Sequence, residues 1–120
     1  TNNQSIGTDI VSVQRIYRLL KQHGDRFKQK TFTINESSYC DGKPNPSIHF
    51  AGRFAAKESI KKCIYSSGYE KEISFNKIEI LPDINGIPIV TNINELTYKE
   101  IKVSISHESE FAVAMAVLFY

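Results

Sequence analysis

Residues 111–119, close to the C-terminal end, form a segment that would be apolar on both faces of a β-strand. Larger apolar side chains alternate there with alanines. The larger ones are Phe111, Val113, Met115, Val117 and Phe119, and the alanines are Ala112, Ala114 and Ala116. Successive side chains of a strand point to opposite faces, so this strand needs cover on both. In a chain of 120 residues, which can build one modest core, the pattern predicts an internal layer on one face and subunit packing on the other.

Helical and strand-like patterns alternate along the rest of the chain. They predict a buried strand over 5–13, helices over 13–23, from 33 and over 47–65, and strands over 73–81, from 87 and over 103–107. Gly24 should end the first helix in a left-handed conformation, and Thr33 to Glu36 matches a capping box. Residues 83–86 and 108–110 are typical of turns between antiparallel strands. We therefore expect a single α+β domain over residues 1–120, in which a small antiparallel sheet packs with one long helix and short helices.

The composition limits the classes of partner. The formal net charge is only +2, so neither nucleic acid nor a membrane is expected as a partner. No apolar run is long enough to span a bilayer and the start shows no signal-peptide pattern, which predicts a cytoplasmic protein. Because the sequence begins with Thr1 rather than Met, a removed upstream segment stays open. Cys40 and Cys63 fit no metal or redox spacing, and we expect two reduced thiols.

The long helix carries one carboxylate, Glu58, among several basic residues. These are Arg53, Lys57, Lys61 and Lys62. At about 100° per residue, Glu58 and Lys62 share one side of the helix with small alanines, where something bulky could approach. This combination can hold a metal ion and a polyphosphate side by side. The alternative is an ordinary solvated ion pair between Glu58 and Lys62, worth about 0.3 kcal/mol.

A second carboxylate, Asp9, stands in the middle of the apolar N-terminal strand. An ionised carboxylate on a buried strand is costly unless a metal, a base or a strong hydrogen bond compensates it. Gly7, two residues earlier on the same strand face, would leave room for such a group. The alternative is that Asp9 caps the following helix, although Ser12 is better placed for that role.

Three ordered motifs give the chain a family resemblance. They are Gly7-Thr-Asp-Ile-Val with Arg15-Ile16, Phe50-Ala-Gly-Arg-Phe-Ala-Ala-Lys-Glu58, and Val103-Ser-Ile-Ser-His107. Together, from about Ile6 to Val117, they resemble the holo-acyl-carrier-protein synthases, which are small bacterial-type 4′-phosphopantetheinyl transferases. The resemblance implies the fold of that family and a homotrimer with active sites between neighbouring subunits. The stretch Lys30–Thr33 keeps only part of the family pattern, which leaves the carrier-protein preference open.

The resemblance also implies an activity. The family transfers the 4′-phosphopantetheine group of coenzyme A to a serine of apo acyl carrier protein, releases adenosine 3′,5′-bisphosphate, and supports fatty acid biosynthesis. Asp9 and Glu58 match the family's Mg²⁺ ligands, and with Lys62 they would be the catalytic residues. Mg²⁺ suits this task because it prefers oxygen ligands and commonly takes one or two carboxylates, with waters and phosphates completing the shell. The general base stays open between Glu58, Asp9 and a water held by the metal, of which we favour the water.

Further positions match the family's binding residues. For coenzyme A they are Arg53, Lys62, Gly86, Pro88, Ser106 and His107, with Lys62 at the pyrophosphate. For the acyl carrier protein they are Arg15, Leu19 and Arg26. Without the resemblance, Arg53 would be interpreted as half of a surface ion pair and His107 as a structural histidine at a strand end. Lys57 points away from Glu58 and is expected either at a subunit boundary or in a structural ion pair.

Two rival functions remain from the residues alone. A non-catalytic module could bind RNA or DNA through the lysines of the long helix, but it would need a stronger positive balance or aromatic platforms on a sheet, and it would leave Asp9 unexplained. The second rival function is that of a relative that binds coenzyme A but has lost transfer activity. The presence of both Asp9 and Glu58 argues against it.

Overall fold

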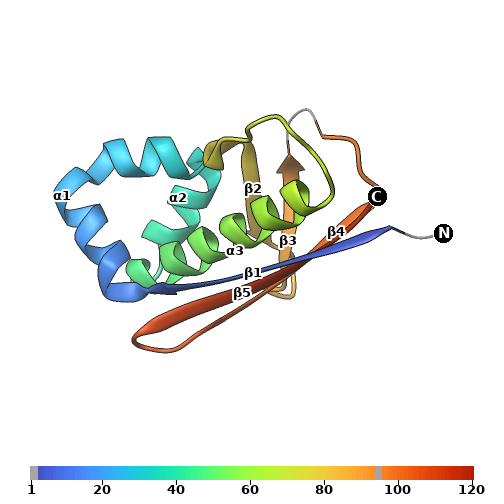
Figure 1. Cartoon of the computed structure of the whole chain (residues 1–120). Helices are drawn as coiled ribbons and strands as arrows, with labels where there is room; N and C mark the ends of the chain where they lie inside the picture. Colours follow the sequence, from blue (N-terminus) through green and yellow to red (C-terminus); the bar gives the residue numbers. More distant parts are fainter. Residues whose placement is uncertain (1–2, 94–95) are drawn as a thin grey trace.

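The structure is a computed structural model and describes residues 3–93 and 96–120 (Figure 1). Its elements follow the order β1 (Gln4–Ser12), α1 (Val13–Thr31), α2 (Ile34–Asp41), α3 (Pro46–Ser66), a 3₁₀ turn (Phe75–Lys77), β2 (Ile78–Pro82), β3 (Pro88–Ile93), β4 (Glu100–His107) and β5 (Phe111–Phe119). Figure 1 shows α3 running along the sheet made by β1, β5 and β4, with α1 and α2 at one end. The predicted α+β architecture with one long helix is confirmed.

The main sheet is antiparallel and has β5 at its centre, in the order β1-β5-β4, while β2 and β3 form a separate hairpin. The predicted pairing of residues 103–107 with 111–119 is confirmed, although β4 begins earlier, at Glu100. Backbone and side-chain hydrogen bonds both close the turn. The Glu108 N–H donates to the Phe111 carbonyl at 2.9 Å, and a Glu108 carboxylate oxygen accepts the backbone N–H groups of Glu110 and Phe111, each at 2.8 Å.

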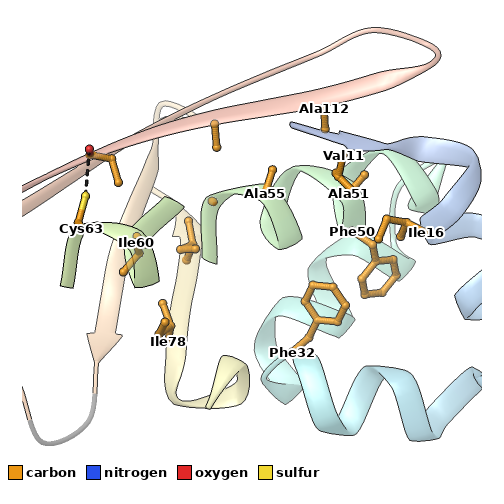
Figure 2. Close-up of a cluster of buried hydrophobic side chains, with 14 of the residues drawn as sticks. Val11, Ile16, Phe32, Phe50, Ala51, Ala55, Ile60, Cys63, Ile78 and Ala112 are labelled. Carbon is orange, nitrogen blue, oxygen red and sulfur yellow. Dashed lines mark hydrogen bonds between the residues drawn. The ribbon is translucent and has the colours of Figure 1, made fainter. Parts of the chain in front are cut away.

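The alanine face of β5 packs against α3. Ala112, Ala114 and Ala116 are buried, and their small side chains allow the helix to approach the strand closely. Two side chains of α3 donate to strand carbonyls: the Ser59 hydroxyl to Ala114 at 3.0 Å and the Cys63 thiol to Ala116 at 3.1 Å. Figure 2 shows the Cys63 contact and the core that continues from it along α3. The predicted internal layer is therefore the α3–β5 contact.

Within residues 3–93 and 96–120, nothing covers the opposite face of this sheet. Its exposed apolar residues are Ile6, Ile10, Phe111, Val113 and Met115, and we call this surface the outer sheet face. The prediction that the first strand is buried throughout is therefore wrong for a single chain, since Ile10 is 64% exposed. The strand alternates, and only its other face, with Ser5, Gly7 and Val11, is buried against α3.

Two predicted boundaries need correction. Gly24 interrupts the helix with a positive φ of 46°, as predicted, but a second helical stretch that was not predicted follows this kink and ends at Thr31. One reason is that Phe27, in the second half, packs edge-on against Phe32 with ring centroids 5.7 Å apart, which anchors that turn to the core. The strand predicted over 73–81 begins only at Ile78, because residues 75–77 form a 3₁₀ turn in which the Phe75 carbonyl accepts the Ile78 N–H.

Other local predictions are confirmed. The Thr33 capping box opens α2, with the Thr33 N–H donating to the Glu36 carboxylate at 2.9 Å and the Glu36 N–H donating to the Thr33 hydroxyl at 3.2 Å. The turn between β2 and β3 places Gly86 at a φ of 82°. In the part of the chain that the structure describes, no helix is long and apolar enough to cross a membrane.

Candidate functional site

The strand β1 crosses α3 at Gly7, and this contact decides where Asp9 lies. The Ser5 hydroxyl donates to the Cys63 carbonyl at 2.7 Å, and a Cβ on Gly7 would lie 1.9 Å from the Ser59 carbonyl oxygen. From Ser5 to Gly7 the strand advances by two residues, while the contacted helix residue changes from Cys63 to Ser59, four residues earlier. Both steps span roughly 6 Å, and the two elements therefore run antiparallel. The same register places Asp9 near the Ala55–Glu58 turn. The room at Gly7 that we expected for a ligand is instead filled by the backbone of α3.

Lys62 joins the strand to the helix at this point. Its ammonium donates to the Thr8 carbonyl at 2.8 Å and lies 3.5 Å from a carboxylate oxygen of Asp9. Lys62 thus pairs with Asp9 across the contact rather than with Glu58 on its own helix, so the alternative of a solvated Glu58–Lys62 pair is wrong. Asp9 does not cap α1 either, because the Ser12 hydroxyl accepts the Arg15 N–H in that role.

Asp9, Glu58 and Lys62 form the first cluster of candidate residues, which we call the carboxylate cluster. Asp9 and Lys62 are in contact, and Glu58 lies half-buried one turn before Lys62 on α3. The Asp9 side chain is 17% exposed, so it is partly shielded yet accessible. Among the described residues no group of three or more His, Cys, Asp or Glu could hold a metal ion. The donor set of two carboxylates fits Mg²⁺, which keeps most of its shell for water and phosphate oxygens, better than it fits zinc.

A second cluster lines a cleft of about 240 Å³ between the first half of α3, the β2–β3 turn and the end of β4. Its lining residues are Tyr39, Ile48, His49, Gly52, Arg53, Gly86, Pro88, Ile105 and His107. We call this the α3 cleft. It brings together four of the residues that the resemblance assigns to coenzyme A. Ser106 does not line it: the alternation of β4 places Ser106 exposed and opposite Val113, on the outer sheet face.

Arg53 gives the α3 cleft a positive charge at all physiological pH values. The residue is 6% exposed, and its guanidinium lies over the Tyr39 ring at 4.4 Å from the ring centroid. The Nε atom is buried without a hydrogen-bond partner. The alternative of a surface ion pair is therefore wrong. A buried donor without a partner costs about 1–3 kcal/mol, so a ligand that accepts from this guanidinium would relieve a standing penalty.

His49 also lines the α3 cleft, and the sequence-based prediction did not include it. Its ring centroid lies 5.7 Å from that of His107 and 6.0 Å from that of Tyr39. Burial lowers the pKa of His49, and the neighbouring His107, Arg53 and Lys43 lower it further. The signal in the sequence was its spacing, because a residue four positions before Arg53 shares its face of a helix.

Lys57 lies outside both clusters and forms the structural ion pair that was one of its two expected roles. Its ammonium lies 2.6 Å from a carboxylate oxygen of Glu36 on α2, and both side chains are fully buried. It also donates to the carbonyls of Phe75 at 2.9 Å and Ile78 at 2.6 Å. The two cysteines are unpaired, as expected, and burial raises the pKa of Cys40 to about 12.

The residues expected to contact a carrier protein lie on α1. Arg15 and Arg26 are exposed, whereas Leu19 is half-buried and packs on the core. The Arg15 guanidinium lies over the Phe54 ring of α3, 5.7 Å from its centroid. Arg26 borders a surface hollow of about 280 Å³ together with His23, Phe27 and Lys30. This end of the molecule therefore presents basic groups beside apolar surface.

Known proteins share both the sequence and the fold. The family model of the 4′-phosphopantetheinyl transferase superfamily matches residues 5–116. The holo-[acyl-carrier-protein] synthase of Protochlamydia amoebophila is 41% identical over 116 residues, which cover 93% of this chain and 94% of the relative.

Solved structures of holo-[acyl-carrier-protein] synthases have a similar fold. The holo-(acyl-carrier-protein) synthase of Bacillus anthracis in complex with CoA (3′,5′-ADP) is 38% identical with a TM-score of 0.80, over 96% of this chain and 95% of that one. The Helicobacter pylori synthase in complex with coenzyme A is 33% identical with a TM-score of 0.81, over 94% of this chain and 98% of that one. With these matches spanning nearly its whole length, the chain belongs to the 4′-phosphopantetheinyl transferase superfamily, among the holo-[acyl-carrier-protein] synthases.

Proposed function

We propose that this chain, as one domain over residues 1–120, transfers the 4′-phosphopantetheine group of coenzyme A to a serine of apo acyl carrier protein. The reaction depends on Mg²⁺, releases adenosine 3′,5′-bisphosphate, takes place in the cytoplasm and supports fatty acid biosynthesis. The observation that supports this proposal is the contact of Asp9 on β1 with Lys62 on α3, one helical turn from Glu58. The solved relatives that hold coenzyme A support the identity of the donor.

The residues of the carboxylate cluster have separable tasks. Asp9 and Glu58 would hold Mg²⁺, which when bound screens the charge of the pyrophosphate. Lys62, which is 54% exposed, can turn its ammonium from the Thr8 carbonyl towards a phosphate oxygen. The serine oxygen of the carrier protein forms a bond to the phosphorus of the pantetheine phosphate while the bond to adenosine 3′,5′-bisphosphate breaks. The serine proton leaves to a base, which is Glu58, Asp9 or a water that they orient.

The two clusters face different sides of α3, which supports an active site shared between subunits. Glu58 is five positions after Arg53, so their side chains leave the helix roughly 140° apart. One coenzyme A molecule would then bind between the carboxylate cluster of one chain and the α3 cleft of a neighbouring chain. We propose a homotrimer that buries the outer sheet face, where Ser106 would come close to the neighbouring chain.

The carboxylate assignment is tested by Glu58→Gln and Asp9→Asn. The wild type, incubated with coenzyme A, Mg²⁺ and apo carrier protein, should add one phosphopantetheine mass to the carrier protein, and a chelator should abolish the gain. Each variant should lose at least about a hundredfold in rate, because it removes one charged ligand of the Mg²⁺ that would screen the negative charge of the transition state. Glu72→Gln, a change on an exposed residue, is the matched control. Full Mg²⁺-dependent turnover by Glu58→Gln would contradict the assignment, and a wild type that binds coenzyme A without transfer would support the inactive relative.

Docking of an acidic carrier protein is tested at Arg15. Acyl carrier proteins are acidic, so reversing this exposed charge to Glu should raise the KM for the carrier protein about tenfold and leave the KM for coenzyme A unchanged. Lys71→Glu, another exposed charge reversal but away from α1, should leave both constants near their wild-type values. Equal increases of both constants in Arg15→Glu would argue against a docking role.

A further inference from the structure

The α3 cleft contains a titratable group, His49, that the family resemblance does not account for. His49 sits one helical turn before Arg53, and its ring faces that of His107 across the cleft, with centroids 5.7 Å apart. The cleft thus has three nitrogen-bearing side chains, Arg53, His49 and His107, around a volume of about 240 Å³. Three potential donors converging on a small volume suit a group with several acceptor oxygens.

We propose that His49 binds the 3′-phosphate of coenzyme A together with Arg53, and that it does so as an imidazolium that forms when the phosphate enters. This rests on the proposed function, because it takes coenzyme A as the ligand. The imidazole takes one proton from solvent and then donates an N–H hydrogen bond to a phosphate oxygen, and no covalent bond changes. Binding of the 3′-phosphate is therefore linked to proton uptake, and His49 distinguishes coenzyme A from dephospho-coenzyme A.

The surroundings of His49 make this linkage physically reasonable. The groups that face it are Tyr39 from α2, Lys43 from the loop after α2, Arg53 from its own helix and His107 from β4. The hairpin contributes Gly86 and Pro88, which do not titrate. Before binding, burial and the three cationic or titratable neighbours keep the pKa of His49 low, so the ring is neutral at neutral pH.

A phosphate dianion reverses this balance. It carries about −1.5 to −2 charges, so it offsets the repulsion from Arg53 and Lys43 and favours the charged imidazole. In the free cleft the pKa of His49 is below its ordinary value, because of burial and the neighbouring His107, Arg53 and Lys43. The proposal requires a higher pKa of His49 in the complex, because the phosphate stabilises the imidazolium. Between these two values the complex holds more protons than the free protein. Affinity for the 3′-phosphate should therefore rise as the pH falls from about 8 towards 6.5, below which the phosphate itself begins to gain a proton.

The direct test counts protons by calorimetry. Adenosine 3′,5′-bisphosphate and coenzyme A are titrated into the wild type near neutral pH, in two buffers with different ionisation enthalpies. We expect an uptake of about half a proton or more per site for both ligands, and clearly less for dephospho-coenzyme A. In His49→Gln, which keeps a neutral hydrogen-bond donor, the uptake should fall close to that of dephospho-coenzyme A, and coenzyme A should bind about tenfold more weakly.

Two controls separate the outcomes. His23→Gln, a change on an exposed histidine of α1, should keep the wild-type proton count. If His49→Gln keeps the wild-type count, or if only His107→Gln loses it, the proposal for His49 is overturned while coenzyme A binding stands. If the wild type binds no coenzyme A, the proposed function fails instead. Should His49→Gln fold poorly, the wild-type His49 ring can be titrated by NMR, where adenosine 3′,5′-bisphosphate must raise its pKa; an unchanged pKa contradicts the proposal.

Discussion

At the scale of single residues, the most consequential pair is Lys57 with Glu36, buried together between α3, α2 and the start of β2. Burial lowers the pKa of Lys57, and the Glu36 carboxylate opposes this. Every polar contact of the pair is local to this junction: the Lys57 ammonium donates to two carbonyls, and Glu36 accepts the N–H groups of Thr33 and Ile80. The pair therefore fixes the orientation of α3, one residue before Glu58.

Removing one partner should be far costlier than removing the pair. Lys57→Met leaves an uncompensated carboxylate in the core and should lower the free energy of unfolding by about 3–5 kcal/mol, as measured by urea denaturation. Adding Glu36→Gln should recover a good part of this loss. Lys28→Met, which breaks the more exposed Lys28–Asp41 pair, should cost only about 1 kcal/mol or less. Equal costs for Lys57→Met and Lys28→Met would contradict this account.

At the scale of elements, the contact of β1 with α3 sets the geometry of the carboxylate cluster. A Cβ on Gly7 would meet not only the Ser59 carbonyl oxygen at 1.9 Å but also the Cys63 backbone nitrogen at 3.0 Å. These are backbone atoms, which cannot rotate away as a side chain can. The absence of a side chain at this one position therefore lets the strand lie against the helix and brings Asp9 to Lys62.

Gly7→Ala should separate the two elements. We expect a loss of at least about 2 kcal/mol in the free energy of unfolding, since overpacking against backbone cannot be relieved by a rotamer change. The transferase rate should fall as well, because Asp9 moves with the strand. Gly42→Ala is the matched control: its Cβ would have no neighbour nearer than 3.5 Å, so it should change stability by less than about 1 kcal/mol. A Gly7→Ala variant as stable as Gly42→Ala would refute the close-contact explanation.

At the scale of the whole molecule, the outer sheet face is an apolar surface that stays exposed to solvent in a single chain. Five large apolar side chains from β1 and β5 lie exposed on one surface, and such patches on soluble proteins commonly mark contacts with other chains. The proposed trimer would cover this face. In the proposed trimer, the α3 cleft of one chain would lie near the carboxylate cluster of another.

Met115→Glu, at the middle of this face, should dissociate the oligomer. A buried, unpaired carboxylate at an interface is strongly unfavourable, so sedimentation should show monomers where the wild type shows trimers. Transferase activity should fall in parallel if the site is shared. Ile34→Glu also introduces a charge at an exposed apolar residue, but on α2, and should leave the oligomer intact. A monomeric wild type, or an unchanged oligomer in Met115→Glu, would contradict the trimer.

The sequence determined by itself those features that depend on a repeat within one segment. The long helix, the capping box of α2, the alternation of β5 and the candidate motifs around Asp9 and Glu58 are local patterns, because backbone geometry repeats every two or 3.6 residues. The boundaries that failed lie where distant contacts accompany a change in local structure. Beyond Gly24 a second helical stretch packs on the core through Phe27, and before β2 a 3₁₀ turn forms whose Phe75 carbonyl accepts from Lys57.

Only the tertiary structure decided how these segments meet. The partner of Lys62 is Asp9 and not Glu58, because the register of β1 on α3 is set by the Gly7 contact and not by helical spacing. The burial of Arg53 and the place of His49 beside His107 likewise depend on α2, α3 and β4 packing together. Contacts between residues far apart in the chain follow from the packing of whole elements, which no periodicity within one segment encodes.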